Sequence, residues 1–258
     1  MHKMKFCIGI PAIIDDEVVS KAVATHVENI CKVNKEVSYI VNIDDYKYKN
    51  AKGSVESCEK IYRNIEKSGK DLHLTYGSPR KGLNLAYKDI LKTFLETDGD
   101  ILIFFDDDHN IINPLIFETV PRVFYEDDTK VVHFANTYLK CSGENPFLGD
   151  VIFENEKIQV RSNKGKFYTQ PGTCLTRKLV EKILSNYDEN SPQNSEDIVG
   201  NNSAYRENDV VTVVSKNQKE PVVSEEGRNQ GFVIPMECHF SCDTRRFIKA
   251  TGSEVGHN

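Results

Sequence analysis

The 258-residue sequence has no long hydrophobic run and no excess of positive charge. A membrane-spanning helix needs about 20 consecutive apolar residues, and no apolar run approaches that length, so we expect no membrane span. The apolar stretch from Phe6 to Ile14 is broken by Pro11 and followed by three acidic residues, which fits a signal peptide poorly. A net charge of −6 argues against a generally basic surface for nucleic acid.

Three common motifs are also absent, namely G-x-x-x-x-G-K-[ST], G-x-G-x-x-G and G-x-S-x-G. Their absence argues against a P-loop NTPase, a dinucleotide-binding Rossmann protein and an α/β-hydrolase. The seven cysteines are odd in number and several lie in apolar stretches. This pattern favours free thiols in a reducing compartment over a disulfide framework, so we expect a cytoplasmic protein.

The first part of the chain alternates between strand and helix patterns. Strands are predicted at residues 6–10, 37–43, 71–76 and 101–105. The intervening helices are predicted to begin after Asp15 or Asp16, after Ser54 and after Gly82. This alternation is typical of an open parallel sheet covered by helices.

The second part of the chain is less regular. The patterns predict a helix near Asn113 that Pro121 disturbs, a helix capped by Thr176, strands at 131–138 and 210–214, and a hairpin about Asn155-Glu156. No linker divides the chain. The fold class is therefore α/β: one Rossmann-like domain, with a mostly parallel sheet and an irregular mixed C-terminal part.

Two acidic clusters follow predicted strands, Asp44-Asp45 after the second and Asp106-Asp107-Asp108 after the fourth. Ligands of open α/β sheets bind beyond the carboxyl ends of the strands. Neighbouring carboxylates repel one another, and a divalent cation such as Mg²⁺ or Mn²⁺ offsets that repulsion. The alternative is a solvated acidic loop that caps a helix.

Two further groups of residues could carry chemistry. Glu196-Asp197 follows Ser195 and either favours a helix dipole or supplies a general base. Cys238, His239 and Cys242 are too few ligands for a structural zinc site, but His239 alone could complete another metal site.

Taken in order, these segments resemble GT-A fold glycosyltransferases, particularly the inverting family 2 type. The resemblance covers roughly residues 4–215. It rests on the order and spacing of six segments: KFCIGIPAI, VSYIVNIDD, RKGLNLAYKDI, ILIFFDDDHN, QPGTCLTRK and SEDIVGNNSAYREN.

The sequence departs from the pattern of that family at three places. Residues 46–49 replace a Gly-Ser-Thr-Asp run, and Tyr87-Lys88 replaces Arg-Asn on the third helix. No Gln-x-x-Arg-Trp follows the Glu-Asp pair, and the chain has no tryptophan. These departures argue against a processive polysaccharide synthase.

The resemblance implies a metal-dependent, hexosyltransferase-type enzyme that moves a sugar from a nucleotide-diphosphate sugar to an acceptor hydroxyl by single displacement. Residues 1–110 would form the nucleotide-binding half of one catalytic domain and residues 111–258 the acceptor-binding half. Asp197, or less favourably Glu196, would be the base. The implied donor-binding residues are Pro11, Asp44, Asp45, Lys81, Gly82, Asp106 and Asp107.

The aspartate-rich segment is a DXD-type motif in this interpretation. Asp106 would touch the ribose, and Asp107 or Asp108 would hold Mn²⁺ or Mg²⁺ against the diphosphate. The implied metal ligands are Asp106, Asp108 and His239. A UDP-sugar is the favoured donor, and the acceptor could be a glycan, a lipid-linked sugar, a protein or a modified base. The oligomeric state is left open.

Three other functions are alternatives to a glycosyltransferase. A sugar-phosphate nucleotidyltransferase normally has a glycine-rich loop after its first strand, where this chain has the acidic sequence PAIIDDEVV. A haloacid-dehalogenase-type phosphatase needs an early Asp-x-Asp followed by Thr or Val, whereas the aspartates here lie mid-chain. The third alternative is a non-catalytic sugar-nucleotide-binding or adaptor domain with the same fold.

Overall fold

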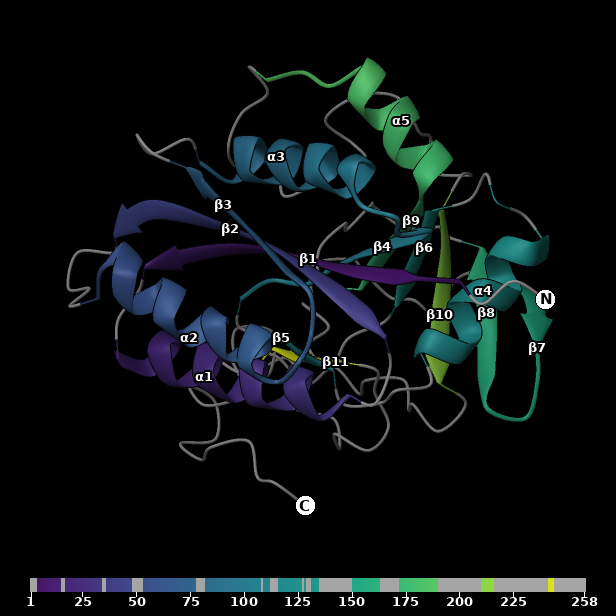
Figure 1. Cartoon of the computed structure of the whole chain (residues 1–258). Coiled ribbons are helices and arrows are strands. Elements are labelled where there is room, and N and C mark those ends of the chain that lie inside the picture. Colours follow the sequence, from purple (N-terminus) through teal and green to yellow (C-terminus); the bar gives the residue numbers. More distant parts are fainter. Residues whose placement is uncertain are drawn as a thin grey trace, which may run out of the picture.

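Short apolar strands and amphipathic helices alternate along the chain, and they assemble around one large sheet (Figure 1). The computed structural model describes residues 4–14, 17–33, 36–47, 53–77, 82–107, 109–111, 116–126, 128, 131–134, 150–162, 172–189, 210–215 and 241–243. The strands are β1 Phe6–Ile14, β2 Val37–Lys47, β3 Leu72–Gly77, β4 Ile101–Phe104, β5 His109–Ile111, β6 Val131–Phe134, β7 Val151–Glu154, β8 Ile158–Ser162, β9 Thr173–Thr176, β10 Val210–Ser215 and β11 Ser241–Asp243. The helices are α1 Glu17–Lys32, α2 Val55–Lys67, α3 Leu83–Glu96, α4 Ile116–Glu126 and α5 Arg177–Ser185.

The large sheet has nine strands in the order β3-β2-β1-β4-β9-β6-β10-β8-β7. The first four are parallel to one another, and β9 runs antiparallel to both of its neighbours, β4 and β6. Strand β10 is parallel to β6, while β8 and β7 form an antiparallel hairpin beside it. The mostly parallel sheet with a mixed C-terminal part is therefore confirmed.

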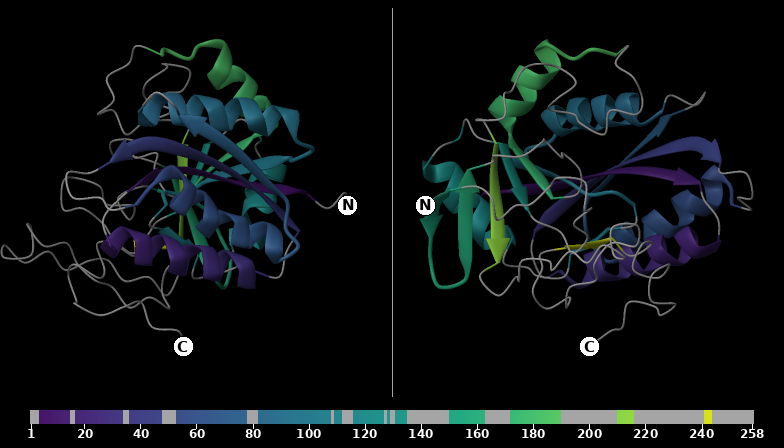
Figure 2. Two further views of the ribbon diagram at one scale, coloured as in Figure 1. Left: turned by 60° about the vertical axis from the view of Figure 1, so that its left-hand side comes forward. Right: turned by 180° about the vertical axis from the view of Figure 1, so that it is seen from behind.

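Helices cover both faces of this sheet (Figure 2). Helices α1 and α2 pack together on one face, and α3 and α5 pack together on the other. The ring of Phe6 contacts that of Phe117 in α4, edge to face at 5.2 Å. Side chains alternate along β1, and a Cβ at Gly9 would meet Ile90 of α3. Phe6 therefore points away from α3, and α4 shares the face of α1 and α2.

Local capping signals explain where two helices begin. The Ser54 hydroxyl accepts from the Ser57 N–H, and the Ser57 hydroxyl accepts from the Ser54 N–H, which forms a reciprocal capping box at α2. The hydroxyl of Thr176 accepts from the Leu179 N–H at the start of α5. Both caps confirm the predicted helix starts.

Helix α4 differs from its prediction because it continues through Pro121. Pro121 lacks only the N–H that would bond to Phe117, and its neighbours Val120 and Phe124 are buried. Burial of the apolar face of α4 compensates for that lost bond. In the part of the chain that the structure describes, none of the helices combines the length and the hydrophobicity that crossing a bilayer requires.

Strands β5, β9 and β11 were not predicted. Segment Thr173–Thr176, which the sequence suggested only as a lead-in to a helix, inserts between β4 and β6. Strand β5 pairs with β11, so that His109 lies opposite Asp243 and Ile111 opposite Ser241. Both pairings join segments that are far apart in sequence, which local periodicity does not report.

Candidate donor-binding site

The two acidic clusters meet at one edge of the sheet. Strand β1 lies between β2, which carries Asp44, and β4, which precedes Asp106. Parallel strands end at the same edge, and adjacent strands are about 4.8 Å apart, so the two clusters are separated by roughly 10 Å along the sheet. Pro11 of β1 lies between them, opposite Asn42. The predicted position of Asp44 and Asp106 near the carboxyl ends of strands is confirmed.

Asp44 is held at the start of α3. Its side chain is buried, and its Oδ2 accepts a hydrogen bond from the Gly82 N–H at 2.8 Å. Gly82 is the N-cap residue of α3 and has φ = 79°, a left-handed conformation that favours glycine. The positive end of the helix dipole stabilises a carboxylate placed there.

Gly77 leaves the space that Asp44 occupies. It lies opposite Asp44 in the β2–β3 register. A Cβ at Gly77 would lie 3.3 Å from the Asp44 Cα and 3.4 Å from its Cγ. An added Cβ would press on the backbone of Asp44 by a few tenths of an ångström, so Gly77 is a candidate positioning residue that the sequence reasoning missed.

Asp45 lies where the pairing of β2 with β1 becomes irregular, because Ile13 is opposite Asp44 but Ile14 is opposite Lys47. The Asp45 Oδ1 atom is buried and has no hydrogen-bond partner. Two residues before Asp44, Asn42 is fully buried and donates to Thr75 Oγ1 at 2.8 Å and to Asp89 of α3 at 3.5 Å. The regular part of β2 therefore holds Asn42 and Asp44 on the face towards α3, and Asp45 belongs to the irregular stretch that follows.

Asp106 and Asp107 follow β4 and differ in burial. Asp107 is buried, and its Oδ2 accepts from the Ile13 N–H at 3.2 Å, which ties the aspartate segment to β1. Asp106 is half-buried. Burial, with the nearby Asp107 carboxylate second, raises the pKa of Cys58 to about 12. Asp107 therefore lies towards α2, where Cys58 is located.

The chemistry of these carboxylates fits a hard cation, since Mg²⁺ and Mn²⁺ prefer oxygen ligands. Within the described ranges, no three potential metal-ligating side chains gather. The predicted residues Lys81, Asp108, Glu196, Asp197 and His239 lie outside the described residues. Of the three aspartates that follow β4, the structure therefore describes the surroundings of Asp106 and Asp107.

A second set of contacts fastens the chain after α5 to the first turn of α3. Asn84 is buried and donates through Nδ2 to the carbonyl oxygens of Asp188 and Glu189, at 3.0 and 3.4 Å. The Tyr187 hydroxyl lies 2.6 Å from both the Oδ1 and the carbonyl oxygen of Asn84. Lys88 forms an ion pair with Glu189. We call these contacts the Asn84 clasp.

The protonation state of the clasp follows from its burial. Desolvation, with the charge of Asp89 second, raises the pKa of Tyr187 well above its ordinary value, so its hydroxyl stays a hydrogen-bond donor at neutral pH. Desolvation and the nearby Lys92 lower the pKa of Lys88. Gly82 thus holds Asp44, and Asn84, two positions later, holds residues 188 and 189 of the chain that leads towards Glu196-Asp197.

No family model matches the sequence, and no curated protein matches it. Among solved structures, residues 1–349 of TarS from S. aureus in complex with UDP-GlcNAc superpose with a TM-score of 0.56 at 15% identity, covering 85% of this chain and 60% of that one. Another structure of TarS 1–349 gives a TM-score of 0.54 at 15% identity, covering 81% and 58%.

The chain shares the fold of this protein, which confirms the expected GT-A-like architecture. It corresponds to no more than 60% of the length of the TarS chains that it resembles. At this level of identity the similarity is one of fold. The fold alone does not identify the activity of this chain.

Proposed function

We propose that this protein is a nucleotide-sugar-dependent glycosyltransferase. The observation that carries the proposal is the placement of Asp44 and the Asp106-Asp107 segment on the two strands that flank β1, at the carboxyl edge of the sheet. The shared fold supports it, because TarS was crystallised with UDP-GlcNAc. In this proposal residues 1–110 bind the donor and residues 111–258 bind the acceptor.

The donor base binds beside β1 and the start of α3. Pro11 lines this position, Asp44 receives a hydrogen bond from the base, and Gly82 holds the Asp44 carboxyl group in place. Lys81 neutralises phosphate charge. Asp45 lies in the irregular stretch that follows Asp44, and we assign it a secondary role at the rim of this site. A UDP-sugar is the donor that we favour.

Asp106 contacts the ribose, and the aspartate segment supplies the ligands of Mg²⁺ or Mn²⁺. Asp107 is held by the Ile13 N–H, which fixes the direction of the segment, and Asp108 and His239 complete the ligand set. When bound, the dication stabilises the negative charge that develops on the leaving diphosphate.

Transfer is proposed to invert the sugar in a single displacement. The acceptor hydroxyl loses its proton to Asp197, or else to Glu196, on the face of the sugar opposite the leaving group. The Asn84 clasp holds the chain just before this pair. The acceptor hydroxyl belongs to a glycan, a lipid-linked sugar, a protein or a modified base.

Free thiols at Cys7, Cys31, Cys58 and Cys174 support a reducing, cytoplasmic location.

A thermal-shift panel of UDP, GDP, CDP and their common sugars, each with and without Mn²⁺, tests the proposal. Ligand at about 100 times its dissociation constant adds about 2.7 kcal/mol, which is about 5–10 °C for a chain of this size. We expect one nucleotide to shift the melting temperature, and only with metal. Asp44→Asn should remove the shift, as should Asp106→Asn combined with Asp108→Asn.

The matched control is Asp128→Asn, which removes one exposed carboxylate that pairs with Lys178 and should leave the shift unchanged. No shift with any nucleotide would overturn the proposal.

If a nucleotide does shift the melting temperature, Asp197→Asn distinguishes an enzyme from a non-catalytic adaptor. An enzyme loses turnover while it still binds the donor, whereas a non-catalytic binding domain shows the same donor shift and no turnover in either form.

A further inference from the structure

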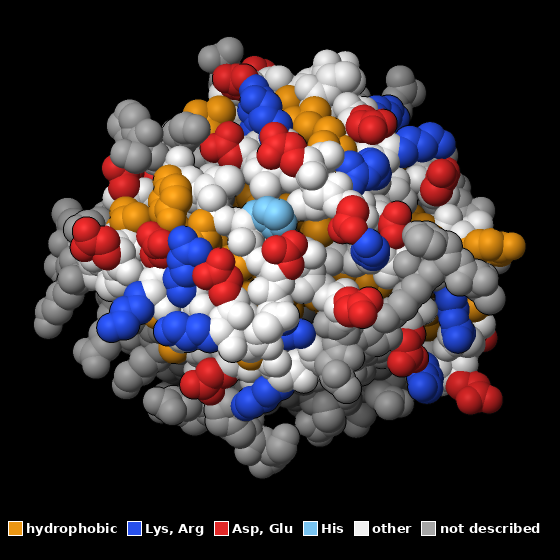
Figure 3. Space-filling model, viewed as in Figure 1, with side chains coloured by type: hydrophobic (Ala, Val, Ile, Leu, Met, Phe, Trp, Pro, Cys, Tyr) orange, Lys and Arg blue, Asp and Glu red, His pale blue; other side chains and the backbone are white. Residues whose placement is uncertain are grey.

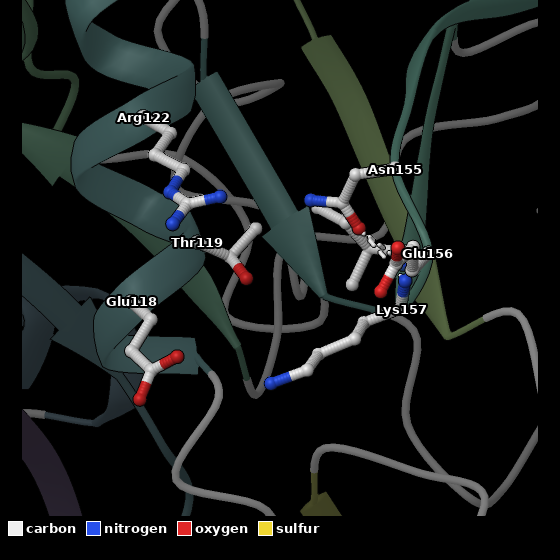
Figure 4. A pocket seen from close by; sticks show the side chains of 7 residues that line it. Glu118, Thr119, Arg122, Asn155, Glu156 and Lys157 are labelled. Atoms are coloured by element: carbon white, nitrogen blue, oxygen red, sulfur yellow. Dashed lines mark hydrogen bonds between the residues drawn. The ribbon is translucent and has the colours of Figure 1, made fainter.

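A cavity lies apart from the proposed donor site, between α4 and the β7–β8 hairpin (Figure 4). Its volume is about 340 Å³. Seven residues line it: Glu118, Thr119, Arg122, Asn155, Glu156, Lys157 and Ile158. All but Ile158 are polar or charged.

The side chains that line this cavity face one another from two elements. The Arg122 guanidinium on α4 and the Asn155 amide on the hairpin point towards each other, and the Lys157 ammonium reaches towards α4 (Figure 4). The Asn155 Oδ1 accepts from the N–H groups of Lys157 and Ile158, at 2.8 and 3.0 Å. These bonds fix the turn and leave the amide nitrogen directed into the cavity.

The charges around the cavity balance and are not used by the fold. Two are acidic, Glu118 and Glu156, and two are basic, Arg122 and Lys157. Among the ion pairs of the described residues, none includes any of these four side chains. The cavity therefore offers strong donors and strong acceptors side by side, with a formal charge of zero.

Such a lining selects a neutral, polyhydroxylated ligand. Each hydroxyl group donates one hydrogen bond and accepts others, so a sugar or polyol can satisfy cationic donors and carboxylate acceptors together. Hydrogen bonds to charged partners are stronger than those between neutral groups. A simple anion would instead meet two carboxylates, and a simple cation would meet Arg122 and Lys157, which is unfavourable in each case.

The topology places this cavity at the same edge of the sheet as the donor site. Ile158, the first residue of β8, pairs with Ser215 at the carboxyl end of β10, and β10 points in the same direction as β6 and β4. The hairpin tip therefore lies at the carboxyl edge. Four strand spacings separate β4 from β8, which is about 20 Å along the sheet.

We propose that this cavity is a subsite for a neutral sugar or polyol unit of a chain-like acceptor, held about 20 Å along the sheet from β4, at whose end the donor is proposed to bind. The inference rests on the proposed function and narrows its acceptor to an oligomeric or polymeric polyhydroxylated chain. A separation of this size is too large for the unit in the cavity to be the one that reacts. The cavity binds a distant unit of the same chain.

The test is retention of the full-length chain on an array of neutral, sulfated and carboxylated oligosaccharides. We expect binding to neutral oligosaccharides that falls at least about tenfold in Arg122→Ala combined with Lys157→Ala. Glu118→Gln combined with Glu156→Gln should weaken it similarly. The matched controls are Lys32→Ala with Lys60→Ala and Glu56→Gln with Glu181→Gln, all exposed positions on other helices, and these should bind like the wild type.

The wild type discriminates between ligand classes. If the wild type retained sulfated or carboxylated oligosaccharides more strongly than neutral ones, and Arg122→Ala with Lys157→Ala abolished that retention, the cavity would be an anion site and the proposal would be wrong. Failure of the wild type to retain any neutral oligosaccharide would also overturn it, as would full retention by both cavity variants.

The donor panel keeps this inference separate from the proposed function. Both cavity variants should retain the nucleotide-dependent thermal shift of the wild type, because the cavity is remote from Asp44. If the nucleotide shift is normal and both cavity variants bind glycan like the wild type, the subsite is wrong and the proposed transferase function stands. Cavity-dependent glycan binding without any nucleotide shift would remove the transferase and leave a carbohydrate-binding site.

Discussion

The sheet is built differently in its interior and at its β7 edge. Interior strands β1 and β4 are buried along almost their whole length, and Asp107 after β4 and Asp44 of the neighbouring β2 are bonded to the backbone of other elements. At the edge, all four residues of β7 are exposed. Asp107 bonds to β1 and Asp44 to α3, whereas the charged side chains of the hairpin cavity face solvent unpaired.

This difference separates two kinds of binding surface. The proposed donor site holds Asp44 and Asp107 through hydrogen bonds from backbone N–H groups, which suits a ligand of fixed shape. The hairpin end presents mixed charges and the apolar side chains of Val151, Ile152 and Phe153 on an exposed edge strand, which suits a ligand that varies in length. On the face in Figure 3, Lys and Arg alternate with Asp and Glu, without a broad patch of one sign.

The sharpest contrast compares two phenylalanines. Phe104 is 1% exposed in β4 and contacts the Tyr87 ring edge to face, whereas Phe153 is 45% exposed in β7. We expect Phe104→Ala to lower the free energy of unfolding by about 3–5 kcal/mol, and Phe153→Ala to lower it by less than about 1 kcal/mol. Urea denaturation measures both. Equal costs would show that the hairpin is packed as firmly as the core.

The next contrast concerns two cationic residues. Arg177 donates to the carbonyl oxygens of Leu95, Thr97 and Gly99 and stacks over Phe94, so it caps the end of α3. We expect Arg177→Ala to cost about 2–3 kcal/mol, since it leaves part-buried carbonyl groups unpaired.

Lys157→Ala in the hairpin serves as the control for Arg177→Ala. It should change stability by no more than about 0.5 kcal/mol, measured by the same denaturation. If Arg177→Ala lost no more stability than this control, water would fully replace the hydrogen bonds that Arg177 donates to the carbonyl groups at the end of α3.

Gly77 tests the rigidity of the donor half. Gly77→Ala should shift the Asp44 backbone slightly and weaken nucleotide binding by up to about tenfold, which is about 1.4 kcal/mol, while the melting temperature without ligand changes little. The matched control is Gly69→Ala, where φ is 82° and nothing lies within 4 Å of the added Cβ.

The control should show the opposite pattern from Gly77→Ala. Gly69→Ala should cost about 1 kcal/mol of stability, because alanine is strained at that backbone angle, and should leave nucleotide affinity as it was. Isothermal titration with the nucleotide found in the thermal panel measures the affinity of both. Unchanged affinity in Gly77→Ala would show that Gly77 does not position Asp44 for the nucleotide.

The smallest expected effect belongs to the Asn84 clasp. Tyr187→Phe removes one hydroxyl and should cost about 1 kcal/mol at pH 7. Because the pKa of Tyr187 is raised in the folded state, its stabilisation is complete below pH 10 and falls as the pH rises above it. Stabilities of wild type and Tyr187→Phe, measured by urea denaturation at pH 7 and above pH 10, should therefore converge. A constant difference would place the Tyr187 hydroxyl in water.

The parts of the fold that the sequence predicted correctly depend on short-range signals. The apolar run at 101–105 became buried β4, Ser54 and Thr176 cap helices, and the hairpin turns at Asn155. Each signal involves residues within a few positions of one another, so its physics acts before any tertiary contact forms. The placement of both acidic clusters followed from the same patterns.

The strand order in the second half could not be predicted from these patterns. Strand β9 joins β4 to β6, and β11 reaches β5 from the far end of the chain. Short strands of three or four residues carry too little periodicity to be recognised, and their partners are chosen by which sheet edge remains open. The roles proposed for Glu196, Asp197 and His239 stay predictions from the resemblance.

The sequence by itself determined the order of strands and helices in the first half, the position of Asp44 and Asp106 at strand ends, and the likeness to GT-A enzymes. Only the tertiary structure bonded Asp44 to Gly82, set Gly77 opposite Asp44, and joined Tyr187 to Asn84 across 103 residues. It alone formed the cavity between α4 and the hairpin. The reason is that periodicity and capping act within a few residues, whereas contacts between distant segments exist only after the chain has closed the loops between them.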